Sequence, residues 1–211
     1  AAEAGSAHGM AQSGRCYLHG IGVQEDTERG EALLRAAAEK GWQPAQGELE
    51  QYCFDRAELL LRGSSKVAAN SRQAVSFYRK AADLGNRRAA FMLGECYRHG
   101  YGVAQDHAAA VIWYRKASRL LEAKIALADM HYFSEGAGQT IENLREALRW
   151  YQQAAEQHED AYAMYSLGFC LLHGQGTVRS QHNAREGVRW LRKAAALGRP
   201  DAQYELGCAH Y

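Results

Sequence analysis

Apolar residues recur at three- and four-residue spacing along most of the chain, which indicates amphipathic helices. Residues 86–121 contain two such stripes, the first with Ala89, Leu93, Cys96 and Tyr97 and the second with Ala110, Trp113, Tyr114 and Ala117. His99 and Gly100 are expected to end the first helix, because a helix C-terminus favours a cationic donor and a residue free to take positive φ. Asp106 is placed to cap the second helix. The segment is therefore predicted to be a helix–turn–helix hairpin that buries Trp113 and Tyr114.

This hairpin pattern returns along the chain. The run from Gly14 to Val23 matches the run from Gly94 to Val103, and a looser copy begins at Gly168. A pair of large residues followed by small ones keeps step with it, as Leu33-Leu34, Phe77-Tyr78, Trp113-Tyr114, Trp150-Tyr151 and Trp190-Leu191. The pairs are 44, 36, 37 and 40 residues apart, which predicts a solenoid of stacked units.

We expect a single repeat domain over residues 1–211. Its repeats are predicted at about 6–41, 42–85, 86–121, 122–158 and 159–198, with partial units at 1–5 and 199–211. Since both ends fall inside a unit, the chain is expected to be a fragment or mature form of a longer protein. The second repeat is the longest, and its first helix, at about residues 44–61, should be two turns longer than the others. Leu121 and His158 stand where other repeats end in glycine, so a tighter turn or another cap is expected there.

Small residues hold one position in each predicted helix. They are Gly14, Gly94, Ala128, Gly168 and Gly207 on first helices and Gly30, Ala74, Ala110, Ala147 and Gly187 on second helices. Glycine inside a helix costs about 0.5–1 kcal/mol relative to alanine, so its recurrence needs a compensating gain. We expect that gain to be close approach of the two helix backbones, with a neighbouring Trp or Tyr laid over the gap.

The recurring residues resemble the Sel1-like repeat, a helix–turn–helix relative of the tetratricopeptide repeat. The resemblance rests on Ala89, Leu93, Gly94, Tyr97, Gly100, Gly102, Val103, Asp106, Trp113, Tyr114, Lys116 and Ala117, and their counterparts cover essentially the whole chain. It implies an all-α, right-handed α/α solenoid of about five repeats plus partial end units. It also implies a surface that binds other proteins. Bacterial members of the family include scaffolds, enzyme regulators and immunity proteins against secreted effectors such as lipases.

The charge balance argues against a nucleic-acid partner. The formal net charge is only +1, although residues 1–58 sum to −5, 72–119 to +6, 120–178 to −5 and 179–211 to +3. Two interpretations of this alternation stay open, namely a solvated surface without function or a partner with matching charged patches. No apolar run approaches the roughly 18 residues that span a bilayer, so membrane insertion is not expected.

The five cysteines invite a disulfide or metal interpretation. Cys16, Cys96 and Cys170 hold equivalent positions, while Cys53 and Cys208 do not. Equivalent positions in stacked repeats lie too far apart for the roughly 7 Å between Cα atoms that a disulfide needs. The disulfide-rich relatives of the family carry two cysteines per repeat, which this chain lacks. We therefore expect small buried thiols, and five unpaired cysteines favour a reducing compartment, with cytoplasm and periplasm both left open.

Catalytic chemistry is not apparent in the sequence. His19, His99 and His173 occur one to each His-Gly turn, in repeats too far apart to share an ion, so helix capping is favoured over a metal site. The Gly-x-Gly turns lack the Lys-Ser/Thr of a phosphate loop, and no Gly-x-Ser-x-Gly, His-Glu-x-x-His or Cys-x-x-Cys motif is present. The sequence therefore predicts no catalytic residue, no metal and no cofactor.

The side chains that vary between repeats are the candidates for function. In tetratricopeptide-like solenoids the first helices line the concave face, and removing the packing stripe leaves candidates there: Arg15, Gln51, Phe91, Glu95, Ile125, Asp129, Tyr165, Phe169 and Tyr204. Aromatic residues gather in the second half of the chain as Tyr132, Tyr162, Tyr165, Phe169 and Tyr204. Some of these are equally explained as core between repeats.

We predict a non-enzymatic interaction module or adaptor that holds a protein or peptide in its concave groove. The alternatives are an inhibitor or immunity protein that neutralises a secreted effector enzyme such as a lipase, and, more remotely, a hydrolase. The sequence leaves the oligomeric state open.

Overall fold

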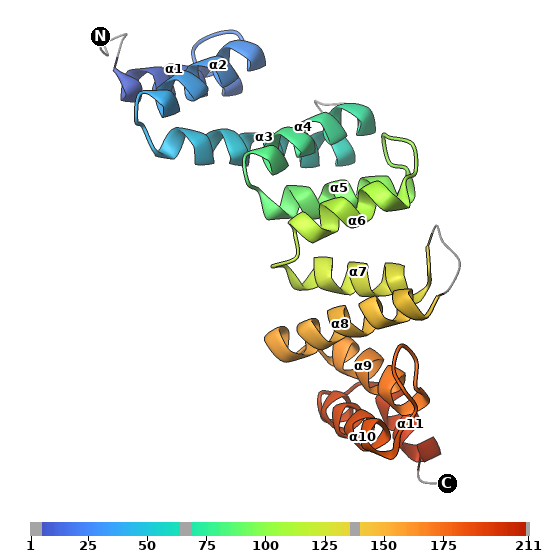
Figure 1. Ribbon diagram of the computed structural model, residues 1–211. Helices are drawn as coiled ribbons and strands as arrows, with labels where there is room; N and C mark the ends of the chain where they lie inside the picture. The colour runs from blue at the N-terminus through green and yellow to red at the C-terminus, as the bar shows by residue number, and fades with distance from the viewer. Residues whose placement is uncertain (1–5, 64–68, 136–139, 210–211) are drawn as a thin grey trace. The chain divides into compact units, whose positions relative to one another are not determined.

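The computed structural model describes residues 6–63, 69–135 and 140–209, and these ranges contain α-helices joined by turns, without a strand (Figure 1). The helices are α1 (Ala7–His19), α2 (Thr27–Glu39), α3 (Pro44–Arg62), α4 (Ser71–Asp83), α5 (Arg87–His99), α6 (His107–Lys116), α7 (Leu121–Tyr132), α8 (Ile141–His158), α9 (Ala161–His173), α10 (Gln181–Ala196) and α11 (Pro200–Ala209). The all-α prediction is confirmed.

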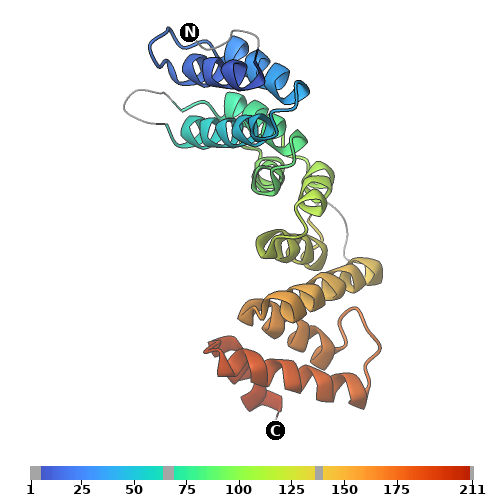
Figure 2. The ribbon, with the colours of Figure 1, turned by 90° about the vertical axis from the view of Figure 1, so that its left-hand side faces the viewer.

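The helices group into two compact units. The first consists of Ala1–Cys96 and Gly100–Ala104, and the second of Tyr97–His99 and Gln105–Tyr211. In the first unit α1 packs on α2 and α3 on α4, with α2 against α3. In the second unit α7 packs on α8 and α9 on α10, with α8 against α9, as the yellow-to-red helices of Figure 2 show. Each unit is therefore a stack of helical hairpins.

Polar caps explain where the helices begin. The Asp26 side chain accepts a hydrogen bond from the backbone N–H of Arg29 at 2.9 Å, and Asp106 accepts one from Ala109 at 2.9 Å. Proline begins α3 and α11, where its missing N–H would have no partner within the helix. The predicted Asp106 cap is confirmed.

Most helix ends follow the predicted glycine rule, and the ends of α6, α7 and α8 do not. Gly100 follows α5 with φ 77°, and its N–H donates to the carbonyl of Cys96. At the end of α8, where glycine is absent, Glu159 takes the left-handed conformation with φ 51°. At the other exception, Leu121 is the first residue of α7, and this helix begins without a side-chain cap. The sequence thus identified both repeat ends where glycine is absent, next to Leu121 and next to His158. The chain turns differently at each of them.

Paired glycines bring the two helices of a hairpin into backbone contact. A Cβ added at Gly14 would lie 3.1 Å from the carbonyl oxygen of Gly30, and one at Gly168 would lie 2.9 Å from that of Gly187. The predicted close approach is confirmed. The residues over the gaps are Leu34 and Leu191, however, rather than the expected Trp or Tyr, and each of them is the second member of its large-residue pair.

The large-residue pairs divide into a buried and a half-buried member. The second members are at most 1% exposed: Leu34, Tyr78, Tyr114, Tyr151 and Leu191. The first members are only half-buried. Trp113, predicted to be buried, instead lies beneath the ammonium of Lys116, which is 3.9 Å from its ring centroid. The reason is geometric, because adjacent residues on a helix are about 100° apart and only one can point into the core.

The second repeat differs from the others as predicted. Its first helix, α3, spans 19 residues, against 13 for α1, α5 and α9. The observed bounds, Pro44–Arg62, agree with the expected range to one residue.

Candidate functional site

Three of the five cysteines are buried, unreactive thiols. All five are unpaired; Cys53, Cys96 and Cys170 are buried, Cys16 is half-buried and Cys208 is exposed. Burial raises the pKa of Cys53 and Cys96 to about 11 and that of Cys170 to about 12. Because the thiolate is the nucleophilic form, these three thiols are unreactive near neutral pH. The prediction of buried core thiols holds for three of the five, and is wrong for Cys208.

The described part of the chain holds no group of three or more His, Cys, Asp and Glu side chains close enough to bind a metal ion. It does hold pockets between successive first helices in each unit. These pockets are the candidate sites.

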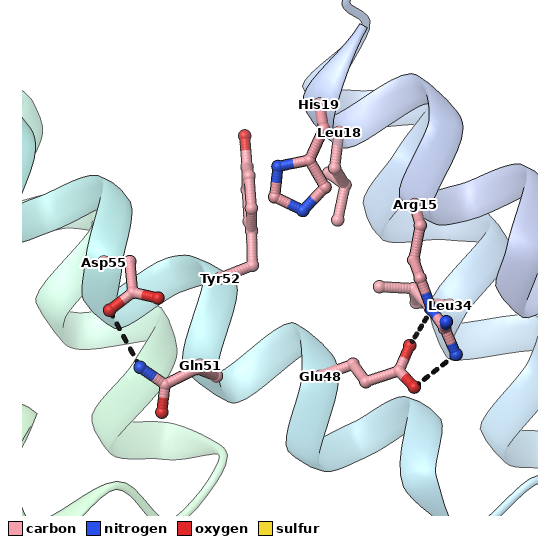
Figure 3. Close-up of a pocket in the computed structure, with 8 residues that line it drawn as sticks. All are labelled: Arg15, Leu18, His19, Leu34, Glu48, Gln51, Tyr52 and Asp55. Atoms are coloured by element: carbon pink, nitrogen blue, oxygen red, sulfur yellow. Dashed lines mark hydrogen bonds and ion pairs between the residues drawn. The ribbon is translucent and has the colours of Figure 1, made fainter. Parts of the chain in front are cut away.

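The α1–α3 pocket of the first unit has a volume of about 320 Å³ (Figure 3). It is lined by Arg15, Leu18, His19, Leu34, Glu48, Gln51, Tyr52 and Asp55. Arg15 reaches from α1 to Glu48 on α3, with its Nε and Nη2 donating to the two carboxylate oxygens at 2.7 and 2.6 Å. The His19 ring meets the Tyr52 ring edge-on, with 5.5 Å between centroids. These contacts tie the two first helices together.

Charged groups dominate this pocket and its extension. A neighbouring hollow of about 250 Å³ shares Leu18, His19, Tyr52 and Asp55 and adds Glu25, Arg56 and Leu59. Arg56 pairs with Glu25 at 3.1 Å, and Asp55 accepts a hydrogen bond from Gln51 at 2.8 Å. Because most of the charges already have partners within the chain, the α1–α3 pocket presents polar groups with little net charge.

The aromatic pocket of the second unit lies between α7 and α9, over Tyr151 of α8, and has a volume of about 190 Å³. It is lined by Tyr132, Phe133, Tyr151, Tyr162, Tyr165, Ser166, Phe169 and Cys170. Its rings contact one another in sequence: Tyr132 with Tyr151 at 6.3 Å, Tyr151 with Tyr162 at 6.2 Å, and Tyr165 with Phe169 at 6.0 Å between centroids. Such spacings are typical of favourable edge-to-face and tilted ring pairs.

A carboxylate is fixed behind the rings. Asp129 Oδ1 accepts hydrogen bonds from the hydroxyls of Tyr151 at 2.6 Å and Tyr162 at 2.9 Å. Burial raises the pKa of Asp129, while these two hydrogen bonds and Arg98 oppose the rise. Burial and the neighbouring Asp129 carboxylate raise the pKa of both tyrosines, so their hydroxyls stay protonated and continue to donate.

Charged groups also surround the rim of the aromatic pocket. The Arg199 guanidinium lies 5.0 Å from the centroid of Tyr162 and 5.7 Å from that of Tyr165, and it pairs with Asp201 at 2.9 Å. The His173 ring lies 4.4 Å from that of Phe169, and its Nε2 is 3.2 Å from a carboxylate oxygen of Glu205. The rim therefore carries two carboxylates, one guanidinium and one imidazole.

The structure distributes the sequence candidates unevenly. Arg15 and Gln51 line the α1–α3 pocket, and Tyr165 and Phe169 line the aromatic pocket. Asp129 lies behind the aromatic pocket, and Ile125 packs against the core of the second unit. The remaining three line neither pocket: Phe91 and Glu95 are half-buried on α5, and Tyr204 is 72% exposed on α11. A role in binding stays a prediction for all nine.

The sequence reasoning missed His19 and Phe133 as pocket residues. His19 is the last residue of α1 and Phe133 directly follows α7, at the position that the sequence pattern assigns to a helix stop. His19 was instead assigned to helix capping because it precedes a glycine. Tyr151 was recognised only as a packing residue, yet it is both core and pocket floor.

Comparison with known proteins supports the repeat assignment. The model of the Sel1 repeat family matches residues 7–42, 51–86, 87–120, 121–158, 161–198 and 200–211. Chitin synthase regulatory factor 3 of Schizosaccharomyces pombe is 31% identical over 143 residues, which cover 66% of this chain and 15% of that protein. Activator of C kinase protein 1 of Saccharomyces cerevisiae is 24% identical over 168 residues, covering 79% of this chain and 22% of that protein. The chain thus spans less than a quarter of the length of these curated relatives.

Solved structures show the same fold. A protective antigen of uropathogenic Escherichia coli with an SLR fold matches 99% of this chain and 42% of its own, with a TM-score of 0.64 and 25% identity. A Sel1 repeat protein of Oxalobacter formigenes matches 96% of this chain and 78% of its own, with a TM-score of 0.62 and 23% identity. Within the described ranges, each helix is too short or too polar to cross a bilayer. The chain belongs to the Sel1 repeat family.

Proposed function

We propose that this chain is a non-enzymatic interaction module that binds a partner protein or peptide, with the aromatic pocket of the second unit as its main contact. Sel1 repeats are generally surfaces for protein–protein interaction, so the family supports the class of function. Tyrosine is also enriched among the residues that carry binding energy at protein interfaces, and tyrosine and phenylalanine both bury a large area with few rotatable bonds.

The observation that carries this proposal is that a pocket lies at the same place in both units and is lined by different residues in each. Counted from the first residue of each family match, α1 corresponds to α7 and α3 to α9. The corresponding pairs are Leu18 and Tyr132, His19 and Phe133, Tyr52 and Tyr162, Asp55 and Tyr165, Arg56 and Ser166, and Leu59 and Phe169. All six positions line a pocket in both units. The fold therefore requires the pocket but not its aromatic lining, and the aromatic lining is available for binding.

The chemistry of the aromatic pocket supports binding rather than catalysis. Its potential nucleophiles are Ser166 and Cys170. The pKa of Cys170 is raised to about 12, which keeps the thiol protonated. The histidine near the pocket, His173, contacts Phe169 and Glu205 rather than either potential nucleophile. A nucleophile needs a base within hydrogen-bond reach, and these contacts do not supply one.

Photo-crosslinking from the pocket tests the proposal. Phe133, 62% exposed at the aromatic pocket, is replaced with benzoylphenylalanine, and Leu197, 57% exposed and outside both pockets, is replaced in the matched control. After irradiation in a lysate of the source organism, one protein should be crosslinked from position 133 and not from position 197. The purified partner should then bind the parent chain in a stoichiometric complex, and Tyr165→Ala with Phe169→Ala should abolish the complex.

Two results would contradict the proposal. The first is a partner that binds the double variant as tightly as the parent, and the second is turnover of a small substrate by the pure protein. The identity of the partner also decides the narrower hypothesis. A secreted effector enzyme such as a lipase, inhibited on binding, would make this chain an inhibitor or immunity protein, whereas a host enzyme left active would make it an adaptor.

A further inference from the structure

We infer that the aromatic pocket receives an arginine side chain of the partner, an inference that rests on the proposed function of this pocket. The pocket holds six aromatic rings around about 190 Å³, and a carboxylate is fixed behind two of them. Aromatic faces attract a cation through the ring quadrupole when the cation lies within about 6 Å of the ring centroid.

Asp129 strengthens that attraction through the tyrosines. The hydroxyls of Tyr151 and Tyr162 both donate hydrogen bonds to Asp129, and each of these bonds shifts electron density toward the phenol ring. The carboxylate itself adds a negative charge behind the pocket. In the first unit, the residue that corresponds to Asp129 is Arg15, so this feature is specific to the aromatic pocket.

The charges around the pocket also favour a cation. Burial raises the pKa of the Tyr165 hydroxyl, and the nearby carboxylates of Glu205 and Asp201 raise it further. Arg199 opposes them but is paired with Asp201 at 2.9 Å. With Asp129, and with Glu135 and Arg98, which both act on Asp129, four carboxylates therefore lie in this region against two guanidiniums. This balance is expected to attract a positively charged segment and to repel an acidic one.

The chain itself shows which cation these rings accept. The Arg199 guanidinium lies over Tyr162 and Tyr165 at 5.0 and 5.7 Å from their centroids. A guanidinium is planar and more weakly hydrated than an ammonium, so it loses less solvation on entering a ring-lined pocket. This comparison favours arginine over lysine.

Peptide titration distinguishes charge from shape. The peptides are Ac-Gly-Gly-Xaa-Gly-Gly-amide with arginine, lysine, citrulline or phenylalanine at Xaa, because citrulline has the length and planarity of arginine without its charge. Binding is followed by NMR of the full chain, with its tyrosine and phenylalanine rings labelled with ¹³C. The arginine peptide should shift the signals of Tyr162, Tyr165 and Phe169, with a Kd of about 1 mM, and citrulline should bind about tenfold more weakly.

Two variants control for the pocket. Tyr165→Leu removes a lining ring and should weaken arginine binding severalfold. Tyr101→Leu removes an exposed tyrosine of the first unit, outside the pocket, and should leave binding unchanged. Equal binding of citrulline, or tighter binding of phenylalanine, would overturn the inference while leaving the pocket as a binding site. Absence of any shift up to about 10 mM arginine peptide would also overturn it, whereas the proposed function is judged separately by the crosslinked partner.

Discussion

Tyr151 on α8 donates its hydroxyl hydrogen bond to Asp129 on α7, with 2.6 Å between the two oxygens. Tyr151 is one of the largest fully buried side chains, and Tyr162 donates to the same carboxylate oxygen. The same contact therefore holds two helices together and positions two rings of the aromatic pocket. This explains how a residue of the packing motif also serves the candidate site.

Tyr151→Phe should lower the free energy of unfolding by about 1.5–3 kcal/mol, because a buried hydrogen bond to a charged acceptor is lost. Urea denaturation measures the change. Tyr204→Phe is the matched control, since Tyr204 is exposed, and should leave the urea midpoint at its parental value. An unchanged midpoint for Tyr151→Phe would show that the hydrogen bond to Asp129 contributes nothing to stability.

Glycine substitutions should have opposite effects at two helical positions. A Cβ at Gly168 would lie 2.9 Å from the Gly187 carbonyl oxygen and from Leu191, so Gly168→Ala should destabilise the protein by about 1–3 kcal/mol. A Cβ at Gly47, within α3, would meet nothing within 4 Å. Gly47→Ala should therefore stabilise by about 0.5–1 kcal/mol. Thermal melts measure both, and shifts of the same sign would contradict the close-approach model.

Adjacent residues of one large-residue pair should differ in their contribution to stability. Tyr114 is fully buried, and Tyr114→Ala should cost about 3–5 kcal/mol through the cavity that it leaves. Trp113 is half-buried under Lys116, so Trp113→Ala should cost clearly less. Urea denaturation of the two single variants compares the costs, and an equal or larger loss for Trp113→Ala would be inconsistent with the observed burial.

The sequence was sufficient to predict the repeat fold because packing residues recur at fixed positions. The caps at Asp26 and Asp106, the glycine contacts and the longer α3 all follow from local rules. The burial of Tyr114 rather than Trp113 does not follow from such rules. The repeat spacing locates the pair along the helix but does not say which of its two residues points into the core.

The candidate site was only partly predictable. Tyr165 and Phe169 were found because they vary between repeats, but their neighbours across the pocket come from α7 and α8. Phe133 was missed because its position corresponds to the histidine of the His-Gly turn in other repeats. The hydrogen bonds from Tyr151 and Tyr162 to Asp129 join side chains up to 33 residues apart. The repeat pattern gives no information about such contacts.

The stability of the second unit should fall in mild acid because of His131. Burial, and secondarily the charge of Arg115, lower the pKa of His131, while Glu146 opposes the shift; its buried Nε2 has no hydrogen-bond partner among the described residues. A histidine whose pKa is lower in the folded than in the unfolded protein stabilises the fold above its unfolded-state pKa, which is about 6.5. This stabilisation is lost as the pH falls below that value.

His131→Tyr, which places the tyrosine of repeats one and three at this position, should remove that loss. The difference in unfolding free energy between variant and parent should move in favour of the variant from about pH 8 to about pH 5. His182→Gln, at an exposed position on α10, is the control and should follow the parent. A constant difference between His131→Tyr and the parent across this range would show that His131 is not the titrating group.

We propose that residues shared between repeats build the fold and that unshared residues bind the partner. A variant that gives the aromatic pocket the residues of the first unit, Phe133→His, Tyr165→Asp and Phe169→Leu, tests it most directly. Isothermal titration calorimetry with the crosslinked partner measures its affinity, and circular dichroism measures its fold. We predict parental helicity and at least about thirtyfold weaker binding. Parental affinity in the folded variant would contradict the claim.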